Sequence, residues 1–151
     1  MKYIHASVSD AKQITTLVQR TIQTIYPKYY PKEVVDFFLN LHSYETIRKD
    51  IESGCVGVLI KDDKIIGTGQ HQGNHITRVY VDPDYQGQGC GSYIMDCLEK
   101  AISQQCNKAV LDSSLPACHL YEKRGYQTIR HERWPMENGV ILVYEVMEKE
   151  L

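Results

Sequence analysis

The sequence predicts a mixed α/β (α+β) fold in one domain over residues 1–151, with a mostly antiparallel sheet of about seven strands and about four helices. Three observations predict it. A chain of 151 residues fits one domain and leaves little room for a second. Apolar residues follow helical spacing in some segments and strand-like spacing in others. Along the chain, these segments give the order β, α, α, β, β, β, α, β, α, β, β.

The N-terminal third is predicted to hold one strand and two helical regions. Residues 2–6 form the strand, and Ser7 stands three residues before Asp10 in a helix-start pattern. The amphipathic helix that follows ends at YPKYYPKE, because its two prolines cannot continue a helix. A second helical region covers residues 31–54, with an expected restart near Ser43.

The remaining elements alternate between strands and helices. CVGVLIKDDKIIGTGQHQ predicts a hairpin that turns at Asp62 and Asp63, and HITRVYVDP predicts a strand ended by Pro83. A glycine-rich loop then leads into a helix with apolar residues at helical spacing over 94–102. KAVLDSS predicts a strand, LPACHLYEKRG a short helix, and YQTIRHERW with VILVYEVMEK a closing pair of strands.

Composition excludes several classes of protein. The formal charge is −2 and no basic stripe stands out, so the sequence predicts no nucleic-acid partner. No apolar run approaches the roughly 20 residues of a membrane helix, and MKYIHASVSD lacks the apolar core of a signal peptide. We therefore expect no membrane partner and a cytoplasmic location.

Cysteines and histidines show no metal-binding pattern. The five cysteines are an odd number without a C-x-x-C pair, which argues against a disulfide framework and against structural zinc. The six histidines are scattered along the chain. We expect no metal. Cys118 and His119 are neighbours, but adjacent helical residues point about 100° apart and do not form a catalytic pair.

The stretch DYQGQGCGS lies between a predicted strand and a predicted helix, an arrangement that holds anions on the free N–H groups of the helix start. Gly91 is followed by Ser92 without a lysine, so the stretch is not a P-loop. A dinucleotide-binding fingerprint needs glycine at position 92 and a parallel βαβ unit near the chain start. The chain has Ser92 and no such unit, so the stretch does not match that fingerprint. A glycine-rich helix cap without a ligand is the alternative.

Two segments resemble the GNAT (GCN5-related) N-acetyltransferases. VYVDPDYQGQGCGSYIMDCLE is similar to the family's acyl-coenzyme A binding segment, whose pattern is matched by Gln86, Gly89 and Gly91. LPACHLYEKRGYQ is similar to its second signature, with Ala117 and Tyr121. The resemblance implies the twisted mixed sheet of the GNAT fold, acetyl-CoA as the acyl donor and a primary amine as the acceptor.

The resemblance also implies a set of residues that bind acetyl-CoA. Main-chain N–H groups of residues 86–92 would hold the pyrophosphate, and Val79 and Val81 would pair with the pantetheine arm. Ser114 stands where the family often has Asn, with Ser113 as the alternative alignment. The implied residues are Val79, Tyr80, Val81, Gln86, Gly87, Gln88, Gly89, Cys90, Gly91, Ser92, Ser114, Ala117 and Tyr121.

Three residues are candidates for catalysis by direct attack of the amine in a ternary complex. The resemblance implies that the Val79 N–H polarises the thioester carbonyl and that Tyr121 protonates the departing thiolate. An amine with a pKa of ~10 must lose a proton, and His75 is the candidate base. Period-two alternation places His75 on one face with Val79 and Val81. An exposed histidine with water as base is the alternative, and His71 and Glu132 are rivals.

The acceptor is expected to be the amine of a small molecule or a peptide. In this fold the acceptor site is built near YPKYYPKE and ERWPMENG, which makes Tyr26, Tyr30 and Trp134 candidate substrate-binding residues. Glu132 and Glu137 would attract a cation. Tyr29 and Tyr30 are equally suited to anchor the loop or form a homodimer surface. A non-catalytic module that binds or senses acyl-CoA is the alternative function.

Overall fold

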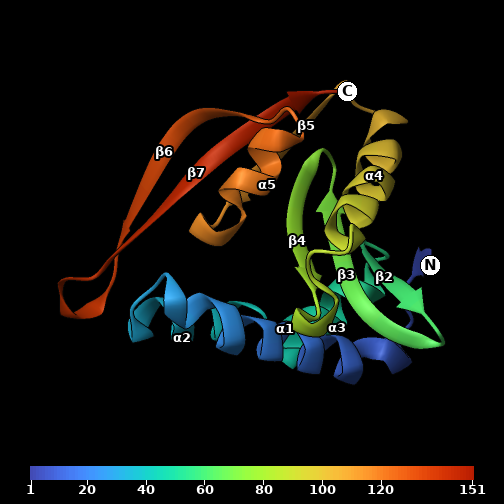
Figure 1. Ribbon diagram of the computed structural model, residues 1–151, viewed down its shortest axis with the longest axis horizontal. Coiled ribbons are helices and arrows are strands. Elements are labelled where there is room, and N and C mark those ends of the chain that lie inside the picture. Colours follow the sequence, from blue (N-terminus) through green and yellow to red (C-terminus); the bar gives the residue numbers. More distant parts are fainter.

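The computed structural model describes all 151 residues and contains one seven-stranded sheet of order β1-β2-β3-β4-β5-β7-β6 (Figure 1). All neighbouring strands are antiparallel except β4 and β5. The predicted fold class is confirmed. The strands are β1 (Lys2–His5), β2 (Val56–Lys61), β3 (Lys64–Gln72), β4 (His75–Val81), β5 (Lys108–Ser113), β6 (Gln127–Pro135) and β7 (Ile141–Glu150).

Five α-helices accompany the sheet, one more than the approximate number expected. The additional helix arises because region 31–54 breaks at His42, and the Ser43 hydroxyl then accepts a hydrogen bond from the Thr46 N–H to cap a new helix. None of the helices is both long and apolar enough to cross a membrane. The helices are α1 (Ala11–Ile25), α2 (Lys32–Leu41), α3 (Tyr44–Glu52), α4 (Cys90–Ser103) and α5 (Cys118–Lys123).

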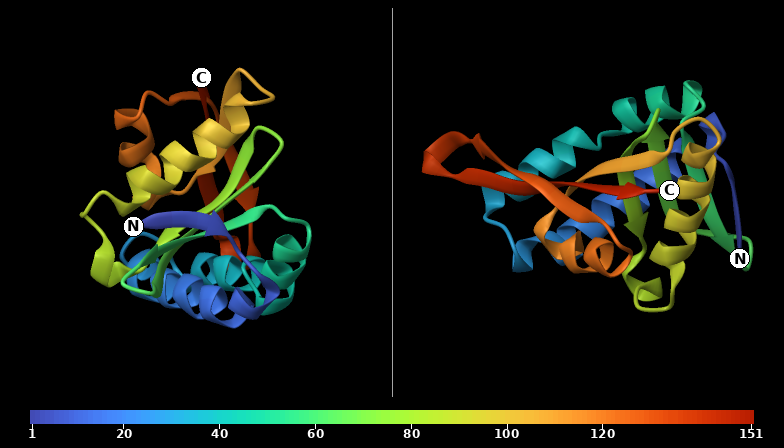
Figure 2. Two further views of the ribbon diagram at one scale, coloured as in Figure 1. Left: turned by 90° about the vertical axis from the view of Figure 1, so that its right-hand side faces the viewer. Right: turned by 90° about the horizontal axis from the view of Figure 1, so that it is seen from above.

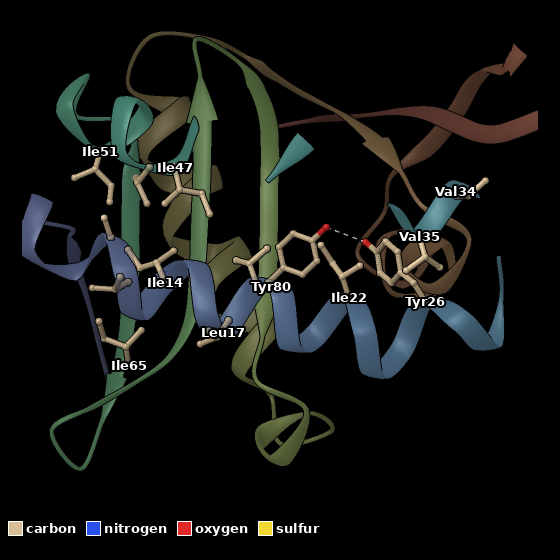
Figure 3. Packing of buried hydrophobic residues seen from close by; sticks show 14 of the residues in the cluster. Ile14, Leu17, Ile22, Tyr26, Val34, Val35, Ile47, Ile51, Ile65 and Tyr80 are labelled. Carbon is tan, nitrogen blue, oxygen red and sulfur yellow. Dashed lines mark hydrogen bonds between the residues drawn. The ribbon is translucent and has the colours of Figure 1, made fainter. Parts of the chain in front are cut away.

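Helices cover both faces of the sheet, as the views in Figure 2 show. Helices α1, α2 and α3 pack on one face around buried residues such as Ile14, Ile22 and Ile47. Figure 3 shows part of this cluster, in which the Tyr26 and Tyr80 hydroxyls are hydrogen-bonded at 3.0 Å. Helices α4 and α5 cover the other face, where their apolar side chains form a second buried cluster.

Strands β4 and β5 pair over a short distance and then diverge. Their parallel ladder contains only His75 opposite Val110 and Ile76 opposite Leu111. Beyond these pairs β5 continues its pairing with β7 on its other side, and the β6–β7 hairpin projects away from β4 (Figure 1). The C-terminal part of β4, residues 77–81, therefore keeps a free backbone edge.

A bulge in β4 reverses the alternation of its side chains. Gln70 of β3 lies opposite Arg78, but the next residue of β3 lies opposite Ile76, so Thr77 is an extra residue. Ile76 consequently packs on the α4 side together with Val81. His75 thus lies on the opposite face from Val79 and Val81, and the prediction that they share a face is wrong.

A buried arginine ties β3 and β4 to two helix ends. The Arg78 side chain is 4% exposed; it donates from Nε to His42 Nδ1 at 3.1 Å and from Nη2 to Asp50 Oδ2 at 3.0 Å. Its Nη1 donates to the Gln70 side-chain oxygen. Because His42 Nδ1 accepts, its proton resides on Nε2. Burial, followed by the Arg78 charge, lowers the pKa of His42 to about 3.

This histidine makes folding stability depend on pH. Between about pH 6.5 and 3 the unfolded chain binds a proton at His42 that the folded chain does not. Stability is therefore lost as pH falls, by about 1.4 kcal/mol per pH unit from this group. In His42→Gln, whose amide oxygen still accepts from Arg78, urea unfolding over this range should lack that contribution. His5→Gln, on the exposed side of β1, serves as the control. If the free energy of unfolding of wild type and of His42→Gln changed with pH in the same way, the prediction would be contradicted.

Candidate functional site

A cavity of about 610 Å³ opens where β4 and β5 diverge. It is lined by β4, the start of α4, residues 114–121, the end of α1, helix α2 and the β6–β7 hairpin. A concave, largely apolar surface with a few polar groups is typical of a small-molecule site. Most of the residues that the sequence indicated for binding line this cavity.

Unpaired main-chain donors lie at one end of the cavity. None of the N–H groups of residues 87–92 donates a hydrogen bond within the protein. Gly87 and Gly89 have φ angles of 73° and 84°, a left-handed conformation that favours glycine. Gln86 fixes the loop by donating from its side chain to the Val81 carbonyl at 3.0 Å. With the helix dipole of α4 behind them, these groups can bind an anion.

The side chains of two residues in this loop lie elsewhere. Gln88 donates to the Asp84 carbonyl at 3.3 Å, and Cys90 is buried in the cluster below α4. Neither residue is part of the cavity lining, whereas Gln86, Gly87, Gly89, Gly91 and Ser92 are. Gln88 and Cys90 can therefore contribute only their main-chain groups to the anion cradle.

The free edge of β4 forms one wall of the cavity. Val79, Tyr80 and Val81 all belong to the lining. The Tyr80 side chain lies on the α1 side of the sheet, where its hydroxyl is hydrogen-bonded to that of Tyr26 (Figure 3). The wall thus offers unpaired backbone groups to an extended ligand, which can add to β4 as a strand does.

Tyr121 stands on the opposite wall. It is 7% exposed, and its hydroxyl makes no side-chain hydrogen bond within the protein although the residue lines the cavity. Burial, then Tyr26 and Cys118, raises the pKa of this phenol, so it stays protonated and remains a donor at neutral pH. Its ring packs edge-on against Tyr126 at 5.8 Å.

The segment before Tyr121 supplies Ser114 and Ala117 to the same wall. Ser113, the alternative alignment, is fully buried, and its hydroxyl is directed to the Ser114 carbonyl and to Cys118 Sγ. The 3₁₀ turn Leu115–Ala117 that follows is fixed by the Leu115 N–H, which donates to the Tyr30 hydroxyl at 2.7 Å.

The candidate bases do not line the cavity. His75 is partly exposed, with its Nε2 3.7 Å from Asp112 Oδ2. His71 contacts the Gly73 carbonyl in the hairpin turn, and Glu132 is paired with Arg130. Asp112, on the same face of the sheet as His75, does belong to the lining. Sequence analysis missed Asp112, although alternation with the apolar Leu111 was the available signal.

Only some of the candidate acceptor residues line the cavity. Tyr26 and Trp134 line the cavity, and the Trp134 ring lies 5.5 Å from that of Phe37. Tyr30 does not line it; burial raises its pKa to about 12, and it anchors Leu115. Tyr29 and Glu137 also lie outside the lining. Sequence analysis missed Phe37, Phe38, Leu41, His42 and Tyr144.

No three His, Cys, Asp or Glu side chains come together in a way that could hold a metal ion. The groups that the cavity offers include unpaired main-chain donors, the Tyr121 phenol and the Asp112 carboxylate. These groups can bind an anion at one end and act on a reacting centre near Tyr121.

Curated relatives match parts of the chain. Glucosamine 6-phosphate N-acetyltransferase of Trypanosoma brucei brucei is 47% identical over 60 residues, 39% of this chain and 40% of that protein. The catalytic subunit NAA20 of the N-terminal acetyltransferase B complex of Arabidopsis thaliana is 38% identical over 69 residues, 42% of this chain and 39% of that protein. The matched part thus spans about two fifths of either relative.

Solved structures match almost the whole chain. A GCN5-related N-acetyltransferase of Rhodopseudomonas palustris superposes with a TM-score of 0.89 at 24% identity, covering 99% of this chain and 95% of that one. The PaiA N-acetyltransferase of Thermoplasma acidophilum, in complex with coenzyme A, gives 0.78 at 16% identity, with 99% and 98% covered. At these identities the likeness is one of fold.

The family model described as the acetyltransferase (GNAT) domain matches residues 25–151, which is most of the chain. This segment contains the glycine loop, the free edge of β4 and Tyr121. The chain therefore belongs to the GNAT family of acetyltransferases.

Proposed function

We propose that the protein transfers the acetyl group of acetyl-CoA to a primary amine of a small molecule or peptide, by direct attack of the amine in a ternary complex. The observation that carries this proposal is the juxtaposition, in one cavity, of the unpaired N–H groups of residues 87–92 and the Tyr121 phenol. Acetyl-CoA supplies an activated thioester, so no covalent enzyme intermediate is required.

Main-chain groups bind the acyl donor. The N–H groups at the start of α4 donate hydrogen bonds to the diphosphate, because the left-handed Gly87 and Gly89 leave them uncovered. The free edge of β4 pairs with the pantetheine arm, using the main-chain groups of Val79 and Val81. The Val79 N–H then polarises the thioester carbonyl.

Tyr121 acts as the proton donor for the departing thiolate. Its raised pKa keeps the proton on the phenol at neutral pH, and its hydroxyl has no competing side-chain partner. A thiol with an ordinary pKa near ~8.5 leaves more readily when its sulfur receives a hydrogen bond or a proton. This role distinguishes an enzyme from a module that only binds or senses acyl-CoA.

The amine must lose its proton on the other side of the cavity. Asp112 lines the cavity and lies 3.7 Å from the His75 imidazole. His75 therefore enters the proposal as the base that takes the proton by way of Asp112 or a water beside it. The names of the two curated relatives support both a small molecule and a peptide N-terminus as acceptor. A cytoplasmic location and a homodimer stay predictions.

Removing the Tyr121 hydroxyl tests the catalytic role. Tyr121→Phe should lower kcat by ~10-fold or more, with little change in the KM for acetyl-CoA, because the phenol acts on the leaving group. Thiol release over a panel of amines measures both constants. Tyr93→Phe, half-buried on α4 outside the cavity, is the matched control. An unchanged kcat in Tyr121→Phe would remove this role.

Altering the glycine loop tests the binding of the acyl donor. In Gly89→Ala the φ of 84° is unfavourable by about 1–2 kcal/mol, so the loop shifts and the N–H groups move. We expect the Kd of acetyl-CoA and of CoA to rise by about 10-fold or more in calorimetry. Gly73→Ala is the control, since Gly73 also has a positive φ, 58°, but lies in a hairpin turn.

The same titrations include ATP and NAD for comparison. Wild type should bind coenzyme A in preference to both nucleotides, with shifted amide resonances for residues 87–92 in a spectrum of the folded protein. Equal Kd values for wild type and Gly89→Ala, or unshifted resonances at saturation, would contradict the cradle.

A further inference from the structure

The acceptor end of the cavity points to a particular class of amine. We propose, on the basis of the acetyl transfer proposed above, that the acceptor is an arylalkylamine, a primary amine on an uncharged aromatic body, and that Asp112 binds its ammonium group. Neither curated relative is named for such a substrate.

The charges of the lining carry the first step. Among the 28 lining residues, only Arg78 and Asp112 have aspartate, glutamate, lysine or arginine side chains. All three guanidinium nitrogens of Arg78 are already occupied, by His42, Gln70 and Asp50. Asp112 is therefore the one charged lining side chain without a strong partner of opposite charge, with only His75 at 3.7 Å. The lining of the acceptor end therefore attracts a cation and offers no free side-chain cation to a phosphate or carboxylate. Arg130, which acts on Tyr144 from outside the lining, is paired with Glu132.

His42 adds no positive charge to this end. Its Nδ1 accepts from the buried Arg78 guanidinium, and a second proton on the ring would have to face that cation. The imidazole lies edge-on to the Tyr80 ring at 5.3 Å, within the same lining. His42 consequently presents a neutral N–H group, which can orient an acceptor without attracting an anion.

Aromatic rings form the surface around this carboxylate. Phe37, Phe38, Trp134 and Tyr144 line the cavity on the α2 and hairpin side, with the Phe37 and Trp134 rings 5.5 Å apart. Trp134 is 52% exposed, so its ring offers area that a ligand can cover. Burying an aromatic body against such rings is favourable, and an ammonium group nearby gains from their π faces.

Asp112 lies where β4 and β5 separate. It belongs to β5 directly after Leu111, the last residue paired with β4, so it stands at the point where the two strands diverge. Asp112 lies opposite Val146 of β7, and Tyr144 is two residues from Val146 on the same face of that strand, so the carboxylate lies beside the aromatic surface. The free edge of β4 and Tyr121 open into the same cavity.

A phosphorylated aminosugar fits this arrangement poorly. A phosphate monoester carries about −1.5 to −2 charges at pH 7 and is normally held by Arg or Lys. Here it would meet aromatic rings and the Asp112 carboxylate, whose charged partner is His75 at 3.7 Å, with Arg78 already paired. We therefore expect glucosamine 6-phosphate to be a poor acceptor for this protein.

A substrate panel tests the class of amine. Thiol release from acetyl-CoA is measured with 2-phenylethylamine, tyramine, cadaverine, an alanine-initiated peptide and glucosamine 6-phosphate. We expect kcat/KM for the two arylalkylamines to exceed that for glucosamine 6-phosphate by about 100-fold or more. It should also exceed that for cadaverine by about 10-fold, because cadaverine has no ring to bury against the aromatic surface. Equal or greater kcat/KM for the aminosugar, the peptide or cadaverine would overturn the assignment.

Direct binding separates this inference from the proposed reaction. Calorimetry measures the Kd of 2-phenylethylamine for the intact protein saturated with CoA. We expect binding that weakens by about 10-fold or more in Asp112→Asn and in Trp134→Ala. If acetyl-CoA binds but no amine is acetylated, the proposed transfer is wrong. The Kd of 2-phenylethylamine then still shows whether the cavity binds an arylalkylamine. Absence of 2-phenylethylamine binding to wild type would overturn the inference.

Matched variants control for general effects. Asp36→Asn removes an exposed carboxylate on α2 outside the cavity, and Tyr29→Ala removes a ring that is 52% exposed, as Trp134 is. Both should leave the Kd of 2-phenylethylamine unchanged, and all four variants should retain the wild-type Kd for acetyl-CoA. Equal 2-phenylethylamine Kd values for Asp112→Asn and Asp36→Asn would overturn the role of Asp112, and folding of each variant is checked by circular dichroism.

Discussion

The divergence of β4 from β5 is the constraint on which the site depends. Two parallel strands that share only two residue pairs leave one edge of β4 unpaired over residues 77–81. Apart from the Val81 carbonyl, which accepts from Gln86, backbone groups in that position need partners, either water or a ligand. The gap also brings the start of α4, the wall with Tyr121 and the aromatic end of the cavity into reach of one ligand. Each face of the sheet has its own packed cluster, and both clusters contain residues of strands on either side of the gap.

The two ends of the cavity use different chemistry. The α4 end offers main-chain N–H groups, which suit an anion whatever the surrounding side chains are. The α2 end offers side chains, namely aromatic rings and Asp112, which suit an amine. In the proposed reaction the anionic acyl donor and the ammonium form of the acceptor would bind at opposite ends. Arg78 would disturb it if its guanidinium were free, and its buried contacts with Asp50 and His42 prevent that.

Local patterns predicted the order of the elements and the glycine loop, because each depends on neighbouring residues, whereas Tyr121 was indicated by the family resemblance. The face of His75 was not predictable by alternation, since the bulge at Thr77 depends on the register with β3. Asp112 was missed because it lines the cavity only as a result of the divergence of β4 from β5, which is a property of the tertiary structure. Phe37 was missed because a ring at helical spacing has the same pattern whether it faces a core or a cavity.

The main-chain character of the cradle has an evolutionary consequence. Its donors are main-chain N–H groups, which every residue except proline has. The side chains of the loop can therefore vary where no other contact constrains them. Gln88, whose side chain reaches only a neighbouring carbonyl, should tolerate almost any replacement in a saturation library. Cys90 should accept only small apolar residues, because it is buried. The cradle therefore depends on the backbone shape set by Gly87 and Gly89, rather than on any reactive group in the loop.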